Sequence, residues 1–561
     1  MRTGAGWFAN VMLFCLVVAS AGNAGCGSGK APDPLQEAEG APADQNVGER
    51  IFVDTRFAEY FAENMTAVND PLAVGDPVVA QVSTPIGMLP GPFAGESINC
   101  RSCHFVTEFT DVAGVRNRTY ADFVTHSPMP RLISGFNSTP RNAMQMVGSL
   151  QPHNGPTFLH FDGEFATPED LVLGTITGRN FGWAPDQCQQ AIAHIARVIR
   201  EDNGNNAGSN TYTHGIPYKT IFLGTDSNIP ADSRLPAQYR MDVTTASDAA
   251  IVEDIAKLVA AYMEGLLFKQ DKFGRFFASP YDVFLRLNHL PPAPKAGETE
   301  QQYAQRLLGL VQNLSSPVFV DGKSGNFQYH PQNFVFGATE LQGLIVFLKG
   351  APGANDGSQH AGNCAACHLA PNFTDFRFHN TGVSQEEYDA ANGAGAFGEL
   401  TIPGLAERTA NPDLYLPASA SHPNATERFR RPAVAGNPQY ADLGLWNVYL
   451  NADMPHPQAN LTAVVCANAT DCAVDQGLAT TIAQFKTPTL RDLEDSAPYF
   501  HNGSKAKFDD VVNFYITMSQ LARQGKLRNG ATEFAGMSIS ADDLNALVAF
   551  LVSLTEDYDD A

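Results

Sequence analysis

The sequence predicts a mostly α-helical protein that consists of two similar domains, with long irregular loops and an insertion between the domains. Three observations support this fold class. The pattern Cys-x-x-Cys-His occurs twice, at residues 100–104 and 364–368. A longer segment of the first half recurs in the second half, as a duplicated domain would. Apolar residues recur at helical spacing in several segments, whereas the alternating pattern of strands is scarce.

The first residues have the composition of a secretory signal. One early Arg is followed by an apolar run from Trp7 to Ala19 and then by small residues, so residues 1–25 are expected to be removed during export. The Ala-Gly-Cys that ends at Cys26 resembles the end of a bacterial lipobox, in which the Cys becomes lipidated. Cleavage after Ala21 is the alternative. We therefore expect an exported protein of the periplasm, or a lipoprotein that is anchored to the outer membrane through Cys26.

An acidic segment without apolar periodicity follows the signal. Residues 26–48 are rich in Gly, Pro, Ala and acids, which is typical of a flexible tether. Over the whole chain of 561 residues, 59 Asp and Glu exceed 36 Lys and Arg, and the formal charge is −23. This charge disfavours binding to phosphates, so we expect no nucleic-acid partner.

Residues 49–202 are expected to form the first domain, which ends in a helix over Cys188–Asp202. Its segment "TPRNAMQMVGSLQPHNGPTFLHFDGEFATPEDL" is similar to "TPTLRDLEDSAPYFHNGSKAKFDDV" in the second half. Both copies contain Thr-Pro, an Arg, aromatic residues, an Asp-Gly or Asn-Gly turn and an acidic helix start. Gly suits the turn and acids suit the first helical turn. Duplication of one domain is the simplest explanation.

The rest of the chain is expected to contain an insertion or linker with helices at residues 203–333 and the second domain at residues 334–561. Asp254–Phe268 and Glu340–Gly350 have helical periodicity. Near the C-terminus, Ser540 is a predicted helix cap, with an acid three residues later. The insertion carries no motif of known chemistry.

Two c-type haems are the best explanation of the repeated motif. In an exported chain, paired cysteines usually form disulfides, and a zinc half-site is another alternative. A His follows the second Cys in both copies, which argues against both alternatives. This spacing allows two thiols to bond to one haem while the adjacent imidazole binds the iron. The predicted attachment residues are Cys100, Cys103, Cys364 and Cys367, and the predicted iron ligands are His104 and His368.

The remaining cysteines have simpler interpretations. Cys466 and Cys472 flank a short loop and are predicted to form a disulfide. Cys188 has no evident partner and is predicted to be a buried thiol.

These motifs resemble the bacterial dihaem cytochrome c peroxidase and MauG family. "GNCAACHLAPNFTDFRFHNTG" and "FKTPTLRDLEDSAPYFHNGS" are similar to its second haem domain, and "TPRNAMQM" with "FDGEFATPEDL" is similar to its first. The resemblance covers most of the chain between Gly48 and Thr555, except the insertion. It implies that His104 binds the iron of a reactive haem and that His368 binds the iron of an electron-transfer haem.

The resemblance also implies a sixth ligand for the second haem and a calcium ion. The family places a Met or a Tyr in the helix after the second turn, and this position falls on Tyr515, with Met518 as the alternative. A phenolate lowers the potential of a haem, whereas a thioether raises it. Asn142 is the expected calcium ligand, since calcium prefers oxygen ligands.

Three positions depart from the pattern of the family. Its bridging Trp, the Arg of the same segment and its distal Glu align with Phe161, Glu164 and Phe181. Phe181 has no proton to transfer, although general acid–base catalysis contributes roughly 10² to 10⁴ in rate. Glu164 and His126 are the candidate replacements.

Three functions are therefore open from the sequence. The first is a peroxide-reducing enzyme that receives electrons from a small redox protein. The second is a dihaem oxygenase, similar to rubber oxygenases, that uses dioxygen on an apolar substrate; the apolar Phe181 favours it. The third is an electron-transfer cytochrome without catalysis, in which both haems would be six-coordinate.

Overall fold

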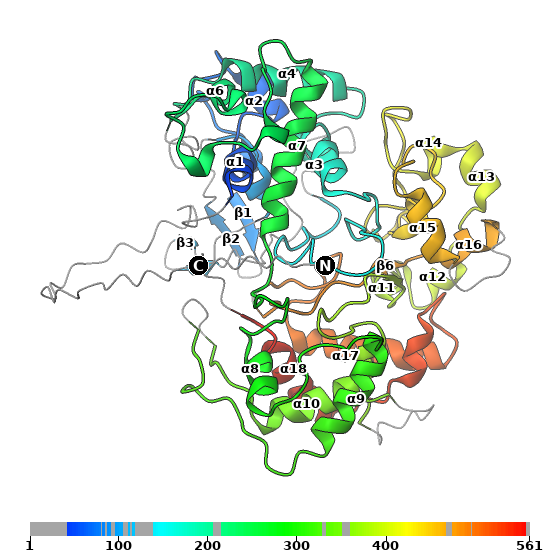
Figure 1. Cartoon of the computed structure of the whole chain (residues 1–561). Helices are drawn as coiled ribbons and strands as arrows, with labels where there is room; N and C mark the ends of the chain where they lie inside the picture. The colour runs from blue at the N-terminus through cyan, green and yellow to red at the C-terminus, as the bar shows by residue number, and fades with distance from the viewer. Residues whose placement is uncertain are drawn as a thin grey trace, which may run out of the picture. The chain divides into compact units, whose positions relative to one another are not determined.

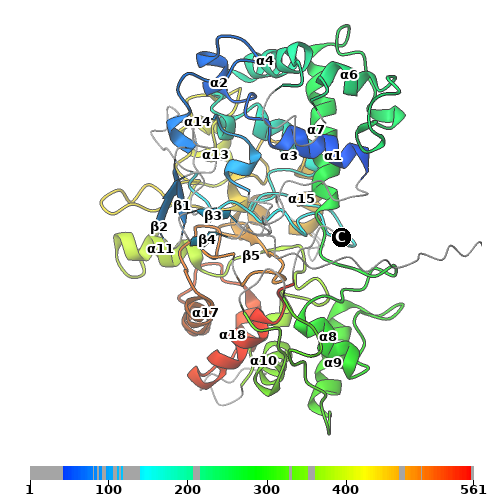
Figure 2. The same cartoon turned by 90° about the vertical axis from the view of Figure 1, so that its left-hand side faces the viewer.

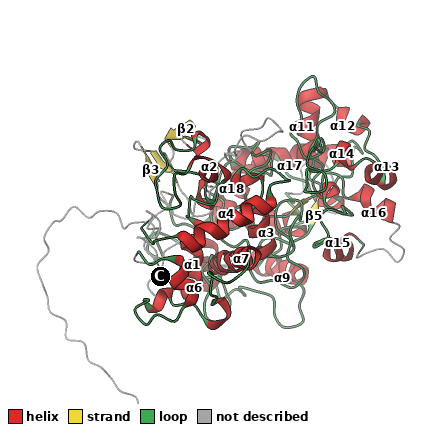
Figure 3. Cartoon of the chain, turned by 90° about the horizontal axis from the view of Figure 1, so that it is seen from above, coloured by secondary structure: helices red, strands yellow, loops and turns green. Residues whose placement is uncertain are grey.

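The computed structural model describes residues 42–79, 81–84, 87–90, 96–104, 110–112, 115–117, 139–205, 215–327, 332–350, 360–466, 474–494 and 496–556. Within these ranges helices dominate, and the strands form three antiparallel two-stranded sheets (Figure 1, Figure 3). The predicted fold class, mostly α with long irregular loops, is confirmed. The predicted signal and Cys26 lie outside the described residues.

The α-helices of the first half are short except for two. They are α1 (Ala43–Phe52), α2 (Glu59–Asn64), α3 (Pro168–Ile176), α4 (Cys188–Glu201), α6 (Tyr218–Leu223) and α7 (Asp248–Gly265). The second half contains α8 (Pro280–Leu287), α9 (Glu300–Gln312), α10 (Ala338–Leu348), α11 (Val383–Asn392), α12 (Ala396–Glu399), α13 (Leu405–Ala410), α14 (Pro412–Tyr415), α15 (Gln458–Val465), α16 (Val474–Thr480), α17 (Phe508–Arg523) and α18 (Leu544–Val552).

Short 3-10 helices and strands connect these helices. The 3-10 helices are η1 (Pro77–Val79), η2 (Cys100–Ser102), η3 (Arg179–Phe181), η4 (Ala231–Ser233), η5 (Ala237–Tyr239), η6 (Cys364–Ala366), η7 (Leu445–Asn447), η8 (Thr532–Gly536) and η9 (Ala541–Asp543). The strand pairs are β1 (Gln81–Thr84) with β2 (Gly87–Pro90), β3 (Thr110–Val112) with β4 (Val115–Asn117), and β5 (Phe378–His379) with β6 (Phe485–Lys486). Among the described helices, none has the length and hydropathy needed to cross a bilayer.

The N-terminal core packs around helix α7. Ser247 caps this helix, because its side chain accepts a hydrogen bond from the backbone N–H of Ala250. The helix is buried along most of its length and lies against α1, α3 and α4 (Figure 1). Where α1 crosses it, a Cβ on Gly48 would lie 2.1 Å from the carbonyl oxygen of Leu258, so the two helices approach through a glycine.

Helix α1 corrects the predicted end of the tether. It begins at Ala43, within the range 26–48, and Asn46, Val47 and Gly48 are buried. Val47 and Ile51 are one helical turn apart and both face the core, and this short apolar stripe is enough to fix the helix against α7. The tether therefore ends before Ala43 rather than at residue 48.

The C-terminal core contains helices α8, α9, α10 and α18, which lie together in both side views (Figure 1, Figure 2). A Cβ on Gly343 of α10 would lie 1.9 Å from the carbonyl oxygen of Ala546 in α18, so the backbones of these helices touch. The predicted cap at Ser540 is confirmed as a capping box with Asp543, from which η9 continues into α18.

The predicted helices occur with small shifts of their ends. Cys188–Asp202 corresponds to α4, Asp254–Phe268 to α7 and Glu340–Gly350 to α10. The predicted insertion contributes to both cores, because α6 and α7 pack in the N-terminal core and α8 and α9 pack in the C-terminal core. A third cluster of buried side chains covers residues 388–483 and includes Phe158 and Phe378.

The internal repeat is visible in the backbone. In the first copy Leu159 and Phe165 form an antiparallel bridge, and in the second Tyr499 and Lys505 do the same. We call these segments the first and second turn loops (residues 159–165 and 499–505). The second residue of each loop has positive φ, 62° at His160 and 70° at Phe500, and the fifth is a glycine with positive φ. Helices α3 and α17 each begin three residues after their loop.

Two backbone hydrogen bonds cross between the copies. The N–H of Lys486, just before the second Thr-Pro, donates to the carbonyl oxygen of Phe161 in the first turn loop at 2.7 Å. The N–H of Asn142, just after the first Thr-Pro, donates to the carbonyl oxygen of His501 in the second turn loop, also at 2.7 Å. Each turn loop is thus held by the other half of the chain.

Candidate haem sites

Both Cys-x-x-Cys-His segments fold into the same short turn. In the first, the backbone N–H groups of Cys103 and His104 both donate to the carbonyl oxygen of Cys100, at 3.1 and 2.9 Å. In the second, the corresponding bonds to the carbonyl oxygen of Cys364 measure 3.2 and 2.8 Å. A turn this tight keeps both thiols and the imidazole close together, as attachment to one haem requires.

A cavity lies beside each turn. The first measures about 200 Å³, and Cys100, Cys103 and His104 line it. The second measures about 230 Å³ and is lined by the corresponding residues Cys364, Cys367 and His368. The remaining lining of both cavities is mostly apolar. Each cavity thus offers two thiols, one imidazole and an apolar enclosure, which is the donor set that a c-type haem needs.

The two cavities adjoin. Six residues line both of them: Met144, Gln145, Phe161, Lys486, Thr487 and Pro488. Phe161 is the residue that the sequence aligned with the bridging Trp, and its place between the cavities agrees with that alignment. The ring of Phe161 also lies 6.3 Å from that of His501, which stacks on Phe485 at 3.5 Å.

Both predicted iron ligands are kept neutral by burial. Burial lowers the pKa of His104 to about 4, and it lowers the pKa of His368 as well. Neutral imidazole is the form that binds a metal. Nδ1 of His368 lies 3.0 Å from the carbonyl oxygen of Phe373, so this nitrogen donates to the backbone and Nε2 is left to bind iron.

Burial also decides the state of the thiols. It raises the pKa of Cys100 and Cys364 to about 12, so both stay protonated at neutral pH. The haem interpretation of the motif needs no thiolate in the final product, because the bonds to haem are thioethers.

Tyr515 and Met518, the two candidate sixth ligands, differ in their position relative to the second cavity. Tyr515 on α17 lines the second cavity together with His368. Met518 is buried among Val383 and Leu527, in the apolar cluster against which Tyr515 also packs, but Met518 itself is not among the residues that line the cavity. Burial raises the pKa of Tyr515, so its phenol is neutral at neutral pH until a metal ion binds the oxygen.

The turn loops identify the residue that matches Tyr515 in the first site. Tyr515 follows the first residue of α17, Phe508, by seven positions, and Thr175 follows the first residue of α3, Pro168, by seven positions. Thr175 lines the first cavity as Tyr515 lines the second. A threonine side chain is short and holds its proton at neutral pH, so the first site has no counterpart of the Tyr515 phenol at this position.

The predicted distal residue Phe181 also lines the first cavity. It ends η3, has an exposed fraction of 2%, and adds an apolar ring to the wall. Arg179 of the same turn lines the cavity too, and its guanidinium lies 3.2 Å from the carboxylate of Glu427.

Glu164 lies beside the first cavity and belongs to an ion-pair network. Its carboxylate binds the guanidinium of Arg430, and Nδ1 of His160 lies 3.0 Å from the same carboxylate. Burial alone would raise the pKa of Glu164, but Arg430 and His160 hold this pKa well below its usual range. Arg430 and Arg141 also share Asp162, at 3.2 and 2.6 Å.

Lys486 is a buried cation between the cavities. Its Nζ donates to the carbonyl oxygen of Phe158 at 2.7 Å, and burial lowers its pKa to about 8. Since Lys486 lines both cavities, its charge is available to the carboxylates of either haem.

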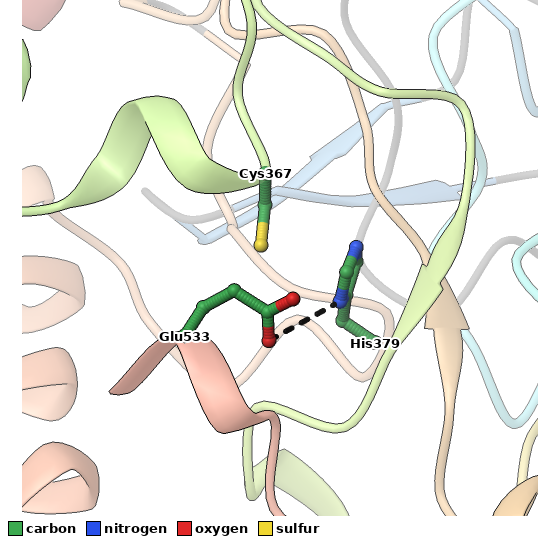
Figure 4. Close-up of side chains that lie close together, drawn as sticks. All are labelled: Cys367, His379 and Glu533. Atoms are coloured by element: carbon green, nitrogen blue, oxygen red, sulfur yellow. Dashed lines mark ion pairs between the residues drawn. The ribbon is translucent and has the colours of Figure 1, made fainter. Parts of the chain in front are cut away.

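A second polar group lies at the edge of the second cavity. Figure 4 shows Cys367, His379 and Glu533 converging from three segments, with their donor atoms within 4.8 Å of one another. Burial lowers the pKa of His379, but hydrogen bonds to Asp375 and Cys367 outweigh it and raise this pKa to about 10. Because Cys367 belongs to the haem attachment motif, we assign its thiol to haem rather than to a separate metal ion.

Other predicted residues have simple outcomes. Asn142 Oδ1 is buried and has no hydrogen-bond partner among the described residues, so it offers one oxygen to a cation.

His126 lies outside the described residues. Cys466 is disulfide-bonded, and its predicted partner Cys472 lies outside them. Cys188 is a free thiol, but it is half-buried at the start of α4 rather than buried, because the first turn of that helix faces solvent.

Known proteins with similar sequences are cytochrome c peroxidases. A stretch of 196 residues, 35% of this chain, is 29% identical to cytochrome-c peroxidase IdrP2 of Denitromonas iodatirespirans and covers 36% of that protein. A stretch of 74 residues, 13% of this chain, is 32% identical to cytochrome-c peroxidase IdrP1 of the same organism and covers 18% of it. The matches thus span about a third or less of these relatives. No protein-family model matches the chain.

Solved structures of similar proteins are more distant. The diheme peroxidase BthA from Burkholderia thailandensis is 15% identical, with a TM-score of 0.40 over 92% of this chain and 86% of that chain. A MauG-like protein associated with microbial copper homeostasis is 15% identical, with a TM-score of 0.41 over 94% of each chain. The resemblance predicted from the motifs is confirmed by the curated relatives: the chain is similar to cytochrome-c peroxidases, a class of haem oxidoreductases.

Sequence reasoning missed several polar residues at the two cavities. His160, Lys486, His379 and His501 all line one of them. His160 lies in a turn and Lys486 in a two-residue strand, where no periodicity identifies a functional side chain. The repeat itself was the available signal, because it aligns His160 with Phe500.

Proposed function

We propose that this protein is an exported dihaem c-type oxidoreductase that reduces hydrogen peroxide at its N-terminal haem, with electrons relayed by its C-terminal haem. The overall reaction consumes one peroxide, two electrons and two protons and forms two waters. A small redox protein supplies the electrons one at a time. The similarity to cytochrome-c peroxidases supports this activity.

The difference between Thr175 and Tyr515 carries the proposal. Both occupy the same position of the repeated helix, and each lines the cavity of its own half. Tyr515 provides the second haem with a sixth ligand, whereas Thr175 leaves the corresponding side of the first haem open. An open side is what a substrate such as peroxide needs, and a six-coordinate haem is suited to electron transfer.

The haem iron, when bound, supplies the centre that exchanges electrons with peroxide. The chain supplies the remaining functions. His104 and His368 hold the metal from the attached side, and the apolar lining with Phe181 limits access of bulk water to the first cavity. Phe161, which lines both cavities, fills the space between the haems with a packed ring rather than with water.

The proposal includes a cellular location and an ion. The N-terminal sequence supports export, with lipid attachment at Cys26 as the means of anchoring. The buried, unpartnered Oδ1 of Asn142 supports one oxygen ligand for calcium between the halves. The proposed location and the proposed calcium ion are each independent of the proposed peroxide reduction.

The apolar distal wall favours a second candidate function. Phe181 lines the first cavity where the family has an acid, and such a wall suits an oxygenase that uses dioxygen on an apolar substrate. This candidate explains Phe181 directly, but it gives no role to the polar group formed by His160, Glu164 and Arg430 on the same cavity.

Rapid mixing of the purified dihaem protein with peroxide, and separately with dioxygen, tests the choice. When peroxide is added to the reduced protein, we expect the absorbance bands of the reduced haems to disappear within the time of the rapid-mixing measurement. Two electrons should be consumed for each peroxide. A protein that ignores peroxide but shows a lasting spectral change with dioxygen would contradict the peroxidase proposal and favour the oxygenase.

A further inference from the structure

We propose that His160, oriented by Glu164, is the acid–base residue on the open side of the first haem, where it moves a proton between the two oxygens of peroxide. This inference rests on the proposed function and names the group that replaces the acid missing at Phe181. It does not follow from the alignment, which directs attention to Glu164 itself.

The repeat places His160 on the open side. In the second turn loop, Phe500 occupies the position of His160, and its ring lies 6.1 Å from the ring of Tyr515. Phe500 is therefore beside the proposed sixth ligand, on the side of the haem opposite His368. The two loops share their bridge, their positive φ angles and their distance to the following helix. His160 accordingly lies on the side of Thr175, opposite His104, and it lines the first cavity.

The hydrogen bonds orient the imidazole. Nδ1 of His160 lies 3.0 Å from the carboxylate of Glu164. Arg430 binds the same carboxylate and keeps it ionised, so Nδ1 carries the proton and donates it. Nε2 then holds the lone pair, and no partner for it occurs among the described residues. This is the arrangement in which a carboxylate fixes the tautomer of a catalytic base.

The backbone holds the residue in a conformation that side chains rarely adopt. His160 has φ of 62°, the conformation that Phe500 also adopts at the matching position, so the turn itself sets the direction of the side chain. The ring also packs edge-on against Phe165, with 5.0 Å between ring centres. The side chain has an exposed fraction of 32%, so protons exchange with solvent.

A metal site is the competing interpretation of this group. The donor atoms of His160, Asp162 and Glu164 lie within 4.8 Å of one another. Asp162, however, is paired with two guanidinium groups, and Glu164 is paired with one of them. Guanidinium groups already neutralise both carboxylates, which disfavours binding of a metal cation by Asp162 and Glu164.

The proton step balances without a net change in His160. Nε2 accepts the proton of one peroxide oxygen and gives it to the other, which leaves as water when the O–O bond breaks. The remaining oxygen takes up two electrons, supplied through the haems by the reduced redox protein, and two protons from solvent, and it leaves as the second water. General acid–base catalysis of this kind contributes roughly 10² to 10⁴ in rate.

Cyanide binding to the oxidised protein tests the inference without turnover. Hydrogen cyanide is neutral near pH 7 and has to lose its proton to bind iron, so a base beside the open side accelerates it. We would compare the association rate, measured by absorbance, in wild type, His160→Phe and Glu164→Gln. His160→Phe copies the residue that the second turn loop accommodates at φ of 70°, so the loop tolerates it. His153→Gln is the control, since His153 stacks on Phe376 beside the same cavity but does not contact Glu164.

We expect the association rate to fall by roughly 10² to 10⁴ in His160→Phe, by less in Glu164→Gln, and not at all in His153→Gln. Haem absorbance confirms that each variant holds both haems. Unchanged cyanide rates in His160→Phe overturn the inference, and so does a wild-type protein that binds no cyanide. If His160 controls the rate of cyanide binding but the protein does not react with peroxide, the assignment of His160 as a base stands. Only the proposed peroxidase function is then contradicted.

Discussion

Single residues distinguish the two sites at matching positions of the repeat. Thr175 and Tyr515 occupy matching positions on α3 and α17, yet only Tyr515 is able to bind iron as a phenolate. His160 and Phe500 differ in the same sense, because one is a proton carrier and the other an apolar ring. The proposed division into an open site and an electron-transfer site rests on these two differences.

Replacing Tyr515 tests this difference at the second haem. In Tyr515→Phe the second haem loses its sixth ligand, so we expect one of the two haems to change to a five-coordinate spectrum and to bind cyanide. Its reduction potential should rise, because a phenolate stabilises the oxidised iron. Optical and electron paramagnetic resonance spectra of the oxidised protein measure both effects.

Met518→Leu is the matched control. Met518 is on the same helix and in the cluster against which Tyr515 packs, but it does not line the cavity. Its replacement should leave the spectra of both haems unchanged. Spectra that change in Met518→Leu but not in Tyr515→Phe would assign the ligand to the methionine instead.

The haem-attachment residues were predictable from local sequence. Cys100, Cys364 and the histidines that follow each pair belong to a motif whose spacing alone defines the chemistry. His160 has no such spacing. Its proposed role depends on the turn that brings it next to Glu164, and on Arg430 from a distant part of the chain. A sequence without its turn geometry does not contain that information.

At the scale of elements, close backbone contact holds the C-terminal helices. The contact of Gly343 in α10 with α18 leaves no room for a methyl group, since its Cβ would lie 1.9 Å from a carbonyl oxygen. We therefore expect Gly343→Ala to destabilise the protein by about 1 to 3 kcal/mol, the usual cost of overpacking. Thermal unfolding followed by circular dichroism measures this effect.

Gly309→Ala is the control for helix propensity. Gly309 lies in α9, is exposed, and its Cβ would have no heavy atom within 4 Å. Alanine is the better helix former there, so stability should rise by about 0.5 to 1 kcal/mol. A loss of stability in Gly309→Ala similar to that in Gly343→Ala would show that contact with α18 is not the cause.

The helices themselves were predictable because their signals are local. Three predicted helices correspond to α4, α7 and α10, and the cap at Ser540 follows from its own tetrapeptide. The start of α1 was not predictable, because its stripe of Val47 and Ile51 is short and becomes meaningful only against α7. The sequence also does not predict which core each helix of the insertion joins, because both cores are apolar.

At the scale of the whole molecule, a buried acid near the end of the described chain links distant segments. Glu556 has an exposed fraction of 1%, and its carboxylate accepts a hydrogen bond from the backbone N–H of Lys269 at 2.7 Å. Its own N–H donates to Asp492 at 3.1 Å. Burial raises the pKa of Glu556 to about 8.

Stability should therefore depend on pH through Glu556. The folded protein binds this proton up to about pH 8, whereas the unfolded chain releases it near its ordinary pKa of 4.5. The stabilising contribution is complete below pH 4.5 and is lost as pH rises towards 8. One pKa unit corresponds to about 1.4 kcal/mol, so Glu556→Gln should gain a few kcal/mol over wild type across this range.

Denaturation midpoints of both proteins between pH 4.5 and 8 measure this gain. The exposed Glu253→Gln removes the same charge from the surface of α7 and should run parallel to wild type at every pH. A constant difference between Glu556→Gln and wild type over the whole range would contradict the prediction.

The crossed hydrogen bonds between the turn loops have a consequence for how the protein is made. Arg430, Lys486 and Thr489 line the first cavity although they belong to the second half of the chain. The emerging N-terminal half therefore cannot enclose its own haem before nearly all of the polypeptide has been synthesised. We therefore expect closure of the first site to follow synthesis of the segment that contains Lys486 and Thr489.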